Sequence, residues 1–360
     1  MLIFLIAFAA SFSIVFLIVR WKHLHGALSM DHDLDGVQKI HRVAVPRIGG
    51  VGIFCGFAAA FAVSEFFRGT VTREHWSLLI CSAPVFLSGL AEDLTKEISP
   101  ALRLVCAAAA AALACWALEA IVTRADVPGL DVLLLIPIAA VVFTVLGVAG
   151  VVHSINLIDG LNGLATMVGI LILSSIAIVA NAVGDSLLVS MALALVGALC
   201  GFMLWNYPVA KVFLGDGGAY FTGFISAELL ILLIMRHQEV SPLYAMLVTI
   251  YPVFETLFSI YRRKVLRGVP AGLPDRGHLH ALLYRRAVAS VGNERAWRDR
   301  NSRTSPRHWI LTFAAVAPAT LFWNRPVILA LFGALFCVTY VWLYFSIARF
   351  RTPSWLKSRS

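Results

Sequence analysis

Two adjacent carboxylates, Glu92 and Asp93, follow directly on a long apolar run. A carboxylate pair at such a boundary can abstract a proton or bind a divalent cation, and Mg²⁺ in particular shares its oxygen ligands with substrate phosphates. Glu92 and Lys96 are also four residues apart, the spacing of an ordinary ion pair on a solvated helix end. Taken alone, the pair leaves a catalytic and a structural interpretation open.

A second polar cluster fills residues 153–163, between two apolar runs. Asn156 and Asp159 are three residues apart and would share one face of a helix. Gly163 and the glycine three residues before it would let a phosphate or a sugar approach the backbone closely. A polar turn with a helix cap at Asn162 explains part of this pattern. Two amides, a carboxylate and two glycines are more than a turn requires, so we interpret the cluster as functional.

Asp216 stands in the sequence Phe-Leu-Gly-Asp-Gly-Gly, at the start of another apolar run. At a helix N-terminus an aspartate can cap the helix, or it can hold a cation whose other ligands are phosphate oxygens. The glycines are similar to a phosphate-binding turn, but their spacing matches neither a Walker A loop nor a dinucleotide fingerprint.

A basic segment, residues 262–307, carries twelve lysines and arginines and contains the sequence Pro-Asp-Arg-Gly-His-Leu-His. If this stretch is extended, Arg276, His278 and His280 project to one side and can grip a pyrophosphate. No third and fourth ligand follow at the spacing of a zinc finger. Attraction of a basic loop to anionic lipid headgroups is the simpler alternative.

A further basic stretch, residues 38–50, leads into the second apolar run. Its cations, Lys39 among them, can bind phosphate, or they can merely anchor a membrane span from one side. Composition does not decide between these two roles.

These clusters are embedded in a strongly apolar chain. Of its 360 residues 60% are hydrophobic, about 216, and 14% are charged. Soluble proteins have about 45–50% apolar and about a quarter charged residues. A transmembrane helix uses roughly 20 apolar residues, so the chain has material for about ten or eleven spans and none for a large separate domain. We therefore predict an all-α integral membrane protein in which residues 1–360 form a single multi-span catalytic domain.

Eleven apolar runs are expected to form this polytopic bundle of about 11 transmembrane helices. They are residues 2–19, 48–67, 76–91, 100–122, 132–152, 163–183, 186–205, 219–235, 241–261, 308–323 and 326–348. The first run is followed by Arg20 and Lys22 and has no basic segment before it, which predicts a retained span instead of a cleaved signal peptide. The six cysteines lie in apolar stretches without a CxxC pair, so we expect neither disulfides nor a thiolate metal site.

The distribution of charge predicts how the bundle is oriented. The eleven spans place 23 of the 29 lysines and arginines on one side of the membrane and five on the other, with one inside a span. By the positive-inside rule this side is the cytoplasm, with the N-terminus outside and the C-terminus cytoplasmic. Every polar cluster falls on the cytoplasmic side, including the long basic cytoplasmic loop 262–307. The net charge of +9 is explained by topology, so no nucleic acid partner is expected.

In this order, the clusters resemble the polyprenyl-phosphate N-acetylhexosamine-1-phosphate transferase superfamily, over about residues 30–310. The resemblance is carried by the acidic pair, Asn-x-x-Asp-Gly, Phe-Leu-Gly-Asp-x-Gly and His-x-His on alternating inner loops. It implies a multi-pass enzyme of the bacterial inner membrane that depends on Mg²⁺, with Mn²⁺ as a substitute. Such an enzyme transfers a sugar-1-phosphate from a UDP-N-acetylhexosamine to undecaprenyl phosphate and releases UMP. A homodimer is compatible with the resemblance.

The resemblance also implies roles for individual residues. Asp216 looks like the principal Mg²⁺ ligand, and Asp159 belongs to the pocket for nucleotide and metal. Glu92 and Asp93 match the acidic pair, one of which would deprotonate or orient the lipid phosphate. The implied substrate-binding residues are Lys39, Asn156, Asn162, Gly163 and Arg276. The histidine motif, with catalytic residues His278 and His280, would hold the pyrophosphate together with the arginine before it.

Three positions depart from the common pattern of the superfamily. Glu92 stands where aspartate is common, Asn162 replaces the second aspartate of Asp-Gly-x-Asp-Gly, and Ala281 replaces a further histidine. The longer side chain at position 92 favours Asp93 as the active member of the pair. The departures point away from the peptidoglycan enzyme and towards the branch that initiates O-antigen or capsule synthesis. Direct attack of the lipid phosphate, without a covalent enzyme intermediate, is the expected mechanism.

The main alternative is a secondary transporter of an anionic solute or a lipid-linked sugar. Transporters place ionisable residues near the bilayer midplane and are often built from internal repeats. Glu228 and Glu255 lie inside predicted spans and fit this interpretation. The chain has no visible repeat, which argues against it.

Overall fold

The computed structural model describes residues 1–30, 44–69, 71–266, 268, 275, 277–286 and 294–349. These residues are mostly helical. Among them, Met30 and Pro46 form an isolated antiparallel β-bridge. The helices are α1 (Leu2–Arg20), α2 (Lys22–Ser29), α3 (Gly49–Arg68), α4 (Arg73–Cys81), α5 (Ala83–Thr95), α6 (Pro100–Ala117), α7 (Leu130–Leu134), α8 (Pro137–Leu157), α9 (Leu164–Ala182), α10 (Ser186–Asn206), α11 (Gly215–Arg236), α12 (Pro242–Val248), α13 (Ile250–Tyr261), α14 (Leu279–Arg286), α15 (Glu294–Leu321) and α16 (Pro326–Ala348).

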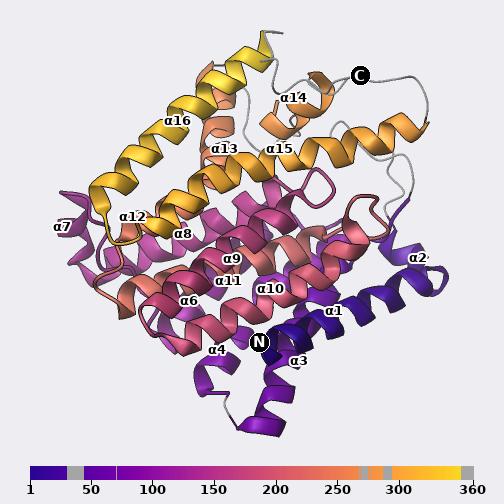
Figure 1. The fold of residues 1–360 in the computed structure, drawn as a ribbon, viewed down its shortest axis with the longest axis horizontal. Coiled ribbons are helices and arrows are strands. Elements are labelled where there is room, and N and C mark those ends of the chain that lie inside the picture. The colour runs from indigo at the N-terminus through magenta and orange to yellow at the C-terminus, as the bar shows by residue number, and fades with distance from the viewer. Residues whose placement is uncertain are drawn as a thin grey trace.

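Many of the long helices run in broadly the same direction, so their ends collect at two opposite faces of the bundle (Figure 1). In the described part of the chain, nine helices are long and apolar enough to cross a membrane, or ten if the bent pair α12–α13 is one span. The prediction of an all-α polytopic membrane protein is confirmed. The remaining predicted span, residues 308–323, falls in the C-terminal part of α15, whose N-terminal part is polar.

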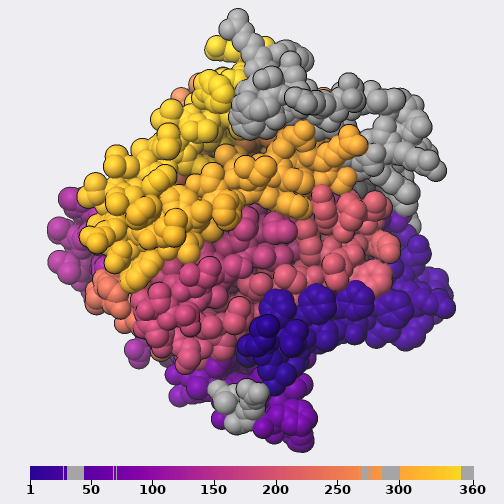
Figure 2. Space-filling view, viewed as in Figure 1, coloured from indigo at the N-terminus to yellow at the C-terminus, as the bar shows by residue number. Residues whose placement is uncertain are grey.

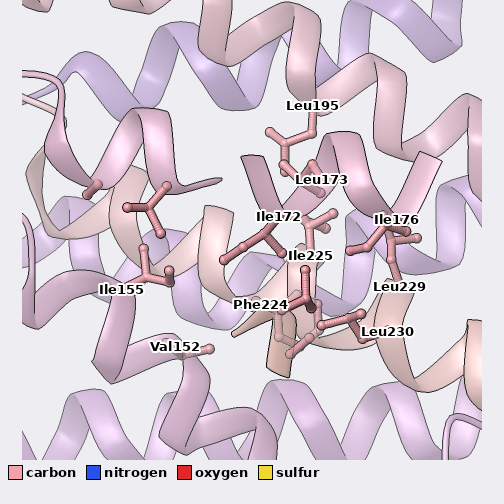
Figure 3. Packing of buried hydrophobic residues seen from close by; sticks show 14 of the residues in the cluster. Val152, Ile155, Ile172, Leu173, Ile176, Leu195, Phe224, Ile225, Leu229 and Leu230 are labelled. Carbon is pink, nitrogen blue, oxygen red and sulfur yellow. The ribbon is translucent and has the colours of Figure 1, made fainter. Parts of the chain in front are cut away.

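Helix α11 forms the centre of the bundle. Nearly all of its residues are buried, and it packs against α3, α5, α8, α9 and α10. Figure 3 shows Phe224 and Ile225 of α11 near Ile155 of α8 and Ile172 of α9. A helix that is apolar on all sides has no face to offer to water and is buried on all sides by its neighbours. This central position fixes the N-terminus of α11 at one end of the bundle.

One of the predicted spans is interrupted at a single residue, and another is sharply bent. Residues 73–95 form α4 and α5, which separate at Ser82, two residues before Pro84. The pair α12–α13 is bent by 72°, close to Pro252 in the first turn of α13. Proline lacks an N–H group and clashes with the preceding turn, which explains breaks at these points. After its bend, α13 leads directly to the segment that carries the predicted histidines.

Much of the segment 262–307, predicted as a loop, is helical. It contains a π-helical turn, α14 and the first half of α15. Asn301, Ser305 and His308 are buried, and their spacing of four and three residues puts them on one face of α15. Asn301 and Ser305 hydrogen-bond to the backbone of Asn162, in the turn before α9, and α15 packs against α9. Because the buried face is polar, a search for apolar periodicity does not detect the helix before residue 308.

Helix α1 packs closely against its neighbours through glycines. Figure 2 shows α1 lying along α10, while α15 and α16 cover the adjoining surface. On α10, a Cβ atom at Gly197 would lie 2.3 Å from the carbonyl oxygen of Phe4, and one at Gly201 would lie 2.5 Å from that of Phe8. A second glycine pair, on α3, also faces α1. Small residues four apart allow this close approach of helix backbones in membranes.

The substitution Gly201→Ala should lower the melting temperature of the purified protein in detergent. The added methyl group would meet the backbone of Phe8, and overpacking of this kind costs about 1–3 kcal/mol. Gly147→Ala on α8 is the matched control, because a Cβ atom there meets no other atom within 4 Å. Equal melting temperatures for the two variants would contradict the close contact between α1 and α10.

Candidate active site

Three of the predicted clusters meet at one end of the bundle, where α5 and α8 end and α11 begins. Asp93 lies in the last turn of α5, Asn156 is next to the last residue of α8, and Asp216 is the second residue of α11. Helix α11 packs against both α5 and α8. The fold therefore brings these three side chains together, as the order of the motifs predicts.

Asp93 caps the N-terminus of α11. Its carboxylate accepts hydrogen bonds from the backbone N–H groups of Asp216 at 2.9 Å and Gly217 at 3.0 Å. Two glycines make room for this contact: Gly89 lies against the backbone of Gly217, and Gly215 has a left-handed φ of 73°. A negative charge is favourable at the N-terminus of a helix dipole. Asp93 thus fixes the backbone that carries Asp216.

Asp216 is contacted by polar side chains from three other segments. Arg103 of α6 donates a hydrogen bond to Oδ2, and the Nδ2 group of Asn156 donates one to Oδ1 at 3.0 Å. Arg47, just before α3, has its guanidinium 3.8 Å from Asp216 and 3.7 Å from Asp93. Two arginines therefore face two carboxylates in a largely buried setting, where unpaired charges are costly.

Asp159, in the turn after α8, lies close enough to feel the charge of Asp216. Burial, and next the negative charge of Asp216, raise the pKa of Asp159 to about 7. Among the described residues, no hydrogen bond stabilises the charged form of Asp159. A buried carboxylate whose charge is disfavoured by a neighbouring carboxylate fits a divalent cation, which would relieve the repulsion.

The described residues contain no group of three or more His, Cys, Asp or Glu side chains arranged around a metal position. Mg²⁺ is commonly held by one or two carboxylates together with substrate phosphates and water. Asp216 and Asp159 would be the protein ligands.

The two members of the acidic pair have different partners. The carboxylate of Glu92 accepts a hydrogen bond from the backbone N–H of Ile98 at 2.9 Å, so it holds the turn after α5. Adjacent helical residues point about 100° apart. The geometry favours Asp93 as the member that belongs to the site.

His278 and His280 lie together at the start of α14. Their rings are parallel, with centroids 5.5 Å apart. The Nδ1–H group of His278 donates a hydrogen bond to Glu255 of α13 at 3.2 Å. His280 lies against Gly160, where a Cβ atom would be 2.5 Å from Nε2. This contact joins the histidine segment to the turn that carries Asp159.

His280 is uncharged at neutral pH. Burial, and next the neighbouring His278, lower the pKa of His280 to about 3. Its Nδ1 atom is buried and has no hydrogen-bond partner among the described residues. A neutral imidazole can donate one hydrogen bond and accept another, so His280 can orient a ligand but does not supply positive charge.

Asn162 and Gly163 are used to fasten their turn to neighbouring segments. The side-chain amide of Asn162 donates to the carbonyl of Pro208 at 3.0 Å, and its backbone carbonyl accepts the Ser305 hydroxyl at 2.7 Å. The N–H group of Gly163 donates to Asn206 at 2.6 Å. The structure thus places both residues in the framework that holds the turn of Asp159.

Two predicted residues, Lys39 and Arg276, lie outside the described residues. Arg103 is a functional candidate that belongs to none of the motifs. The signal that could have found it is its position: an arginine inside the apolar run 100–122 is costly in a membrane and is often functional. Arg47 lies in the basic stretch before the second span, in which the resemblance points to Lys39 instead.

Comparison with known proteins matches residues 75–234 to a family described as glycosyl transferase family 4. The chain is also 30% identical, over 252 residues, to a Bacillus subtilis protein named probable undecaprenyl-phosphate N-acetylglucosaminyl 1-phosphate transferase. The alignment covers 69% of this chain and 68% of that protein. This chain belongs to the polyprenyl-phosphate N-acetylhexosamine-1-phosphate transferase superfamily.

Two further members of the superfamily are named undecaprenyl-phosphate alpha-N-acetylglucosaminyl 1-phosphate transferase. The one from Thermotoga maritima is 30% identical over 255 residues, which cover 71% of this chain and 73% of that protein. The one from Escherichia coli K12 is 23% identical over 264 residues, which cover 72% and 70%. The resemblance inferred from the motifs is confirmed at the level of the superfamily.

The family match contains the cluster around the N-terminus of α11. Asp93, Asn156, Asp159 and Asp216 all fall within residues 75–234. His278 lies beyond this segment, and the histidine segment reaches the cluster through the packing of its second histidine on the turn after α8.

Proposed function

We propose that this chain transfers an N-acetylhexosamine-1-phosphate from a UDP-sugar to undecaprenyl phosphate and releases UMP. The observation that carries the proposal is the meeting of Asp93, Asp216, Arg47 and Arg103 at one end of a bundle of membrane-spanning helices. A lipid phosphate can reach such a site from the bilayer, and a nucleotide sugar can reach it from water. Membership of the superfamily supports the same reaction.

The proposed reaction is a direct displacement at phosphorus. An oxygen of the lipid phosphate attacks the β-phosphorus, which bears the sugar. As this bond forms, the bridging bond to the α-phosphate breaks, so UMP leaves and the sugar remains on a lipid diphosphate. A phosphate monoester has a second pKa near 6, so the nucleophile is mostly dianionic at neutral pH and requires no strong base. The main obstacle is repulsion between two anions, which positioning and positive charge offset.

Each residue of the cluster has a place in this proposal. Mg²⁺, or Mn²⁺ in its stead, would be held by Asp216 and Asp159 and would neutralise charge on the diphosphate. Asp93 holds Asp216 in position by capping α11. Arg103 supplies positive charge beside Asp216, and Asn156 orients the same carboxylate.

The histidine segment would bind the diphosphate of the donor. His278 and Arg276 are the proposed contacts, and His280 would contribute a neutral hydrogen bond. Lys39, before the second span, is assigned to the lipid phosphate or the nucleotide. Glu92 supports the turn after α5. No covalent intermediate is proposed, so a phosphoryl-enzyme trapped with UDP-sugar alone would contradict the mechanism.

We place the site on the cytoplasmic face of a bacterial inner membrane. The surplus of lysine and arginine on the side of the polar clusters supports this orientation. Residues 1–360 would act as one domain, with 262–307 contributing part of the site. The departures at Asn162 and Ala281 support the branch that initiates O-antigen or capsule synthesis. A homodimer would leave the described cluster complete within each chain.

The proposal is tested with the purified full-length protein in detergent, undecaprenyl phosphate, Mg²⁺ and a panel of UDP-N-acetylhexosamines. We expect UMP and a lipid-linked sugar in equal amounts with at least one donor, and no UMP when the lipid phosphate is left out. Chelation of the cation should stop the reaction, and Mn²⁺ should restore it. Absence of UMP with every donor, together with solute flux in vesicles, would favour the transporter instead.

A further inference from the structure

The buried carboxylate of Glu255, in the middle of α13, is bound by three groups from two other segments. Its side chain is only 1% exposed. Oε1 accepts hydrogen bonds from the Nδ1–H group of His278 at 3.2 Å and from the backbone N–H of Leu279 at 3.0 Å. Oε2 accepts the hydroxyl of Tyr340, from α16, at 2.5 Å. Glu255 therefore ties α13, the histidine segment and α16 together.

This set of partners explains how a carboxylate can be buried at this depth. A buried charge is costly unless it is paired and hydrogen-bonded, and three donors satisfy this one. Because an ionised carboxylate only accepts hydrogen bonds, His278 must carry its proton on Nδ1. The contact with Leu279 also caps the first turn of α14. Glu255 thus determines both the tautomer of His278 and the place where α14 begins.

The orientation of His278 is transmitted to the site by packing. Its ring stacks in parallel on His280, with an angle of 1° between the planes. His280 in turn lies against Gly160, next to Asp159. The other nitrogen of His278, Nε2, is 3.9 Å from Asp275, beyond hydrogen-bond distance. With Nδ1 committed to Glu255, Nε2 is the atom of His278 that can act on a ligand.

We propose that Glu255 is a positioning residue of this active site: it orients His278, and through the stacked histidines it sets the turn of Asp159 relative to the donor diphosphate. The inference rests on the proposed function. Carboxylates that orient metal-binding histidines in this manner typically change metal affinity or activity by about 10–100-fold when they are removed, and we expect an effect of the same order here. Tyr340 supports Glu255 from the C-terminal helix, so α16 contributes to the site without reaching it.

The test compares Glu255→Gln with His278→Ala and with the double variant, using the full-length protein in detergent. Glutamine keeps the size of the side chain and an oxygen for Leu279, but it removes the charge. We expect Glu255→Gln to melt close to the wild type and to lose about 10–100-fold in kcat/KM for UDP-N-acetylglucosamine. The double variant should be no worse than His278→Ala alone, because both changes act through the same ring.

A matched control is Glu228→Gln in α11. Glu228 is equally buried, but neither of its oxygens has a partner among the described residues, so this variant should keep wild-type kinetics. Tyr340→Phe removes one hydrogen bond to Glu255 and should cause a smaller loss in the same direction. Multiplicative losses in the double variant, or unchanged kinetics in Glu255→Gln, would overturn the proposal.

A second readout separates this inference from the proposed function. Modification by diethyl pyrocarbonate, mapped by mass spectrometry, reports how reactive Nε2 of His278 is. The hydrogen bond from Nδ1–H to a carboxylate makes Nε2 more nucleophilic, so His278 should react at the same rate in the wild type and in Glu228→Gln, and more slowly in Glu255→Gln. If the wild type transfers no sugar-1-phosphate but this pattern holds, the proposed function fails while the positioning of His278 stands. Equal labelling in all three proteins would refute the positioning.

Discussion

Asp216→Asn should reduce UMP release by about 10³-fold, and the residual activity should no longer depend on Mg²⁺ concentration. The asparagine keeps the shape of the side chain, and Asp93 still caps α11 through backbone groups, so the fold should be retained. What is lost is the negative charge at the place where Arg103 and the proposed cation meet. Removing a single preorganised electrostatic contact typically costs about 10²–10³ in rate.

The matched control for this variant is Asp126→Asn, in the loop between α6 and α7 at the opposite end of the bundle. Asp126 has a left-handed φ of 56°, a conformation that asparagine adopts readily, and asparagine keeps an oxygen for the hydroxyl of Ser241, so the substitution should leave the rate unchanged. Full activity of Asp216→Asn with an unchanged Mg²⁺ requirement would remove Asp216 from the proposed metal site.

Arg103→Ala should lower kcat/KM by about 10²-fold or more, the second large effect that the structure predicts. Arg103 donates directly to Asp216, and its loss would leave that half-buried carboxylate without this charged partner. It would also remove positive charge from the place where two anionic substrates must approach each other. Arg103→Lys should recover only part of the activity, because an ammonium group does not reproduce the planar fork of a guanidinium.

Steady-state kinetics for both substrates measure this effect, and Arg325→Ala serves as its control. Arg325 is exposed at the opposite end of the bundle, just before α16, and its removal should leave the kinetics unchanged. If Arg103→Ala kept wild-type kinetics, Arg103 would be only a structural partner of Asp216.

The overall architecture can be predicted from the sequence because membranes impose simple rules. Twenty-residue apolar runs predict helices, and polar clusters between them predict one functional face. The meeting of Asp93, Asn156 and Asp216 follows from this pattern, since each stands at the end of its span that faces the same side of the membrane. The order of the spans predicts this meeting of side chains better than any single motif does.

The features that could not be predicted depend on contacts between distant segments. The capping of α11 by Asp93 requires two helices to approach within hydrogen-bond distance, and no local pattern encodes that approach. Arg103 matches no motif, so only its position in an apolar run marks it. The buried face of α15, with Asn301 and Ser305, is polar and therefore escapes any rule that equates burial with apolar residues.

The interpretation of Glu255 also changes once its partners are known. From the sequence, a carboxylate inside a span suggests either a structural pair or a transport site. In the structure its partners are His278, Leu279 and Tyr340, which connect it to the histidine segment. Glu228, the other carboxylate inside a span, has no such connection among the described residues.

The central claim is that a sugar-1-phosphate, and not the sugar alone, is transferred to the lipid phosphate. The most direct test uses UDP-N-acetylglucosamine labelled with ³²P at the β-phosphate, together with undecaprenyl phosphate and the purified full-length protein. We expect the label to appear in the lipid product and the released nucleotide to be unlabelled UMP. Labelled UDP in solution with an unlabelled lipid product, or label retained on the protein, would contradict it.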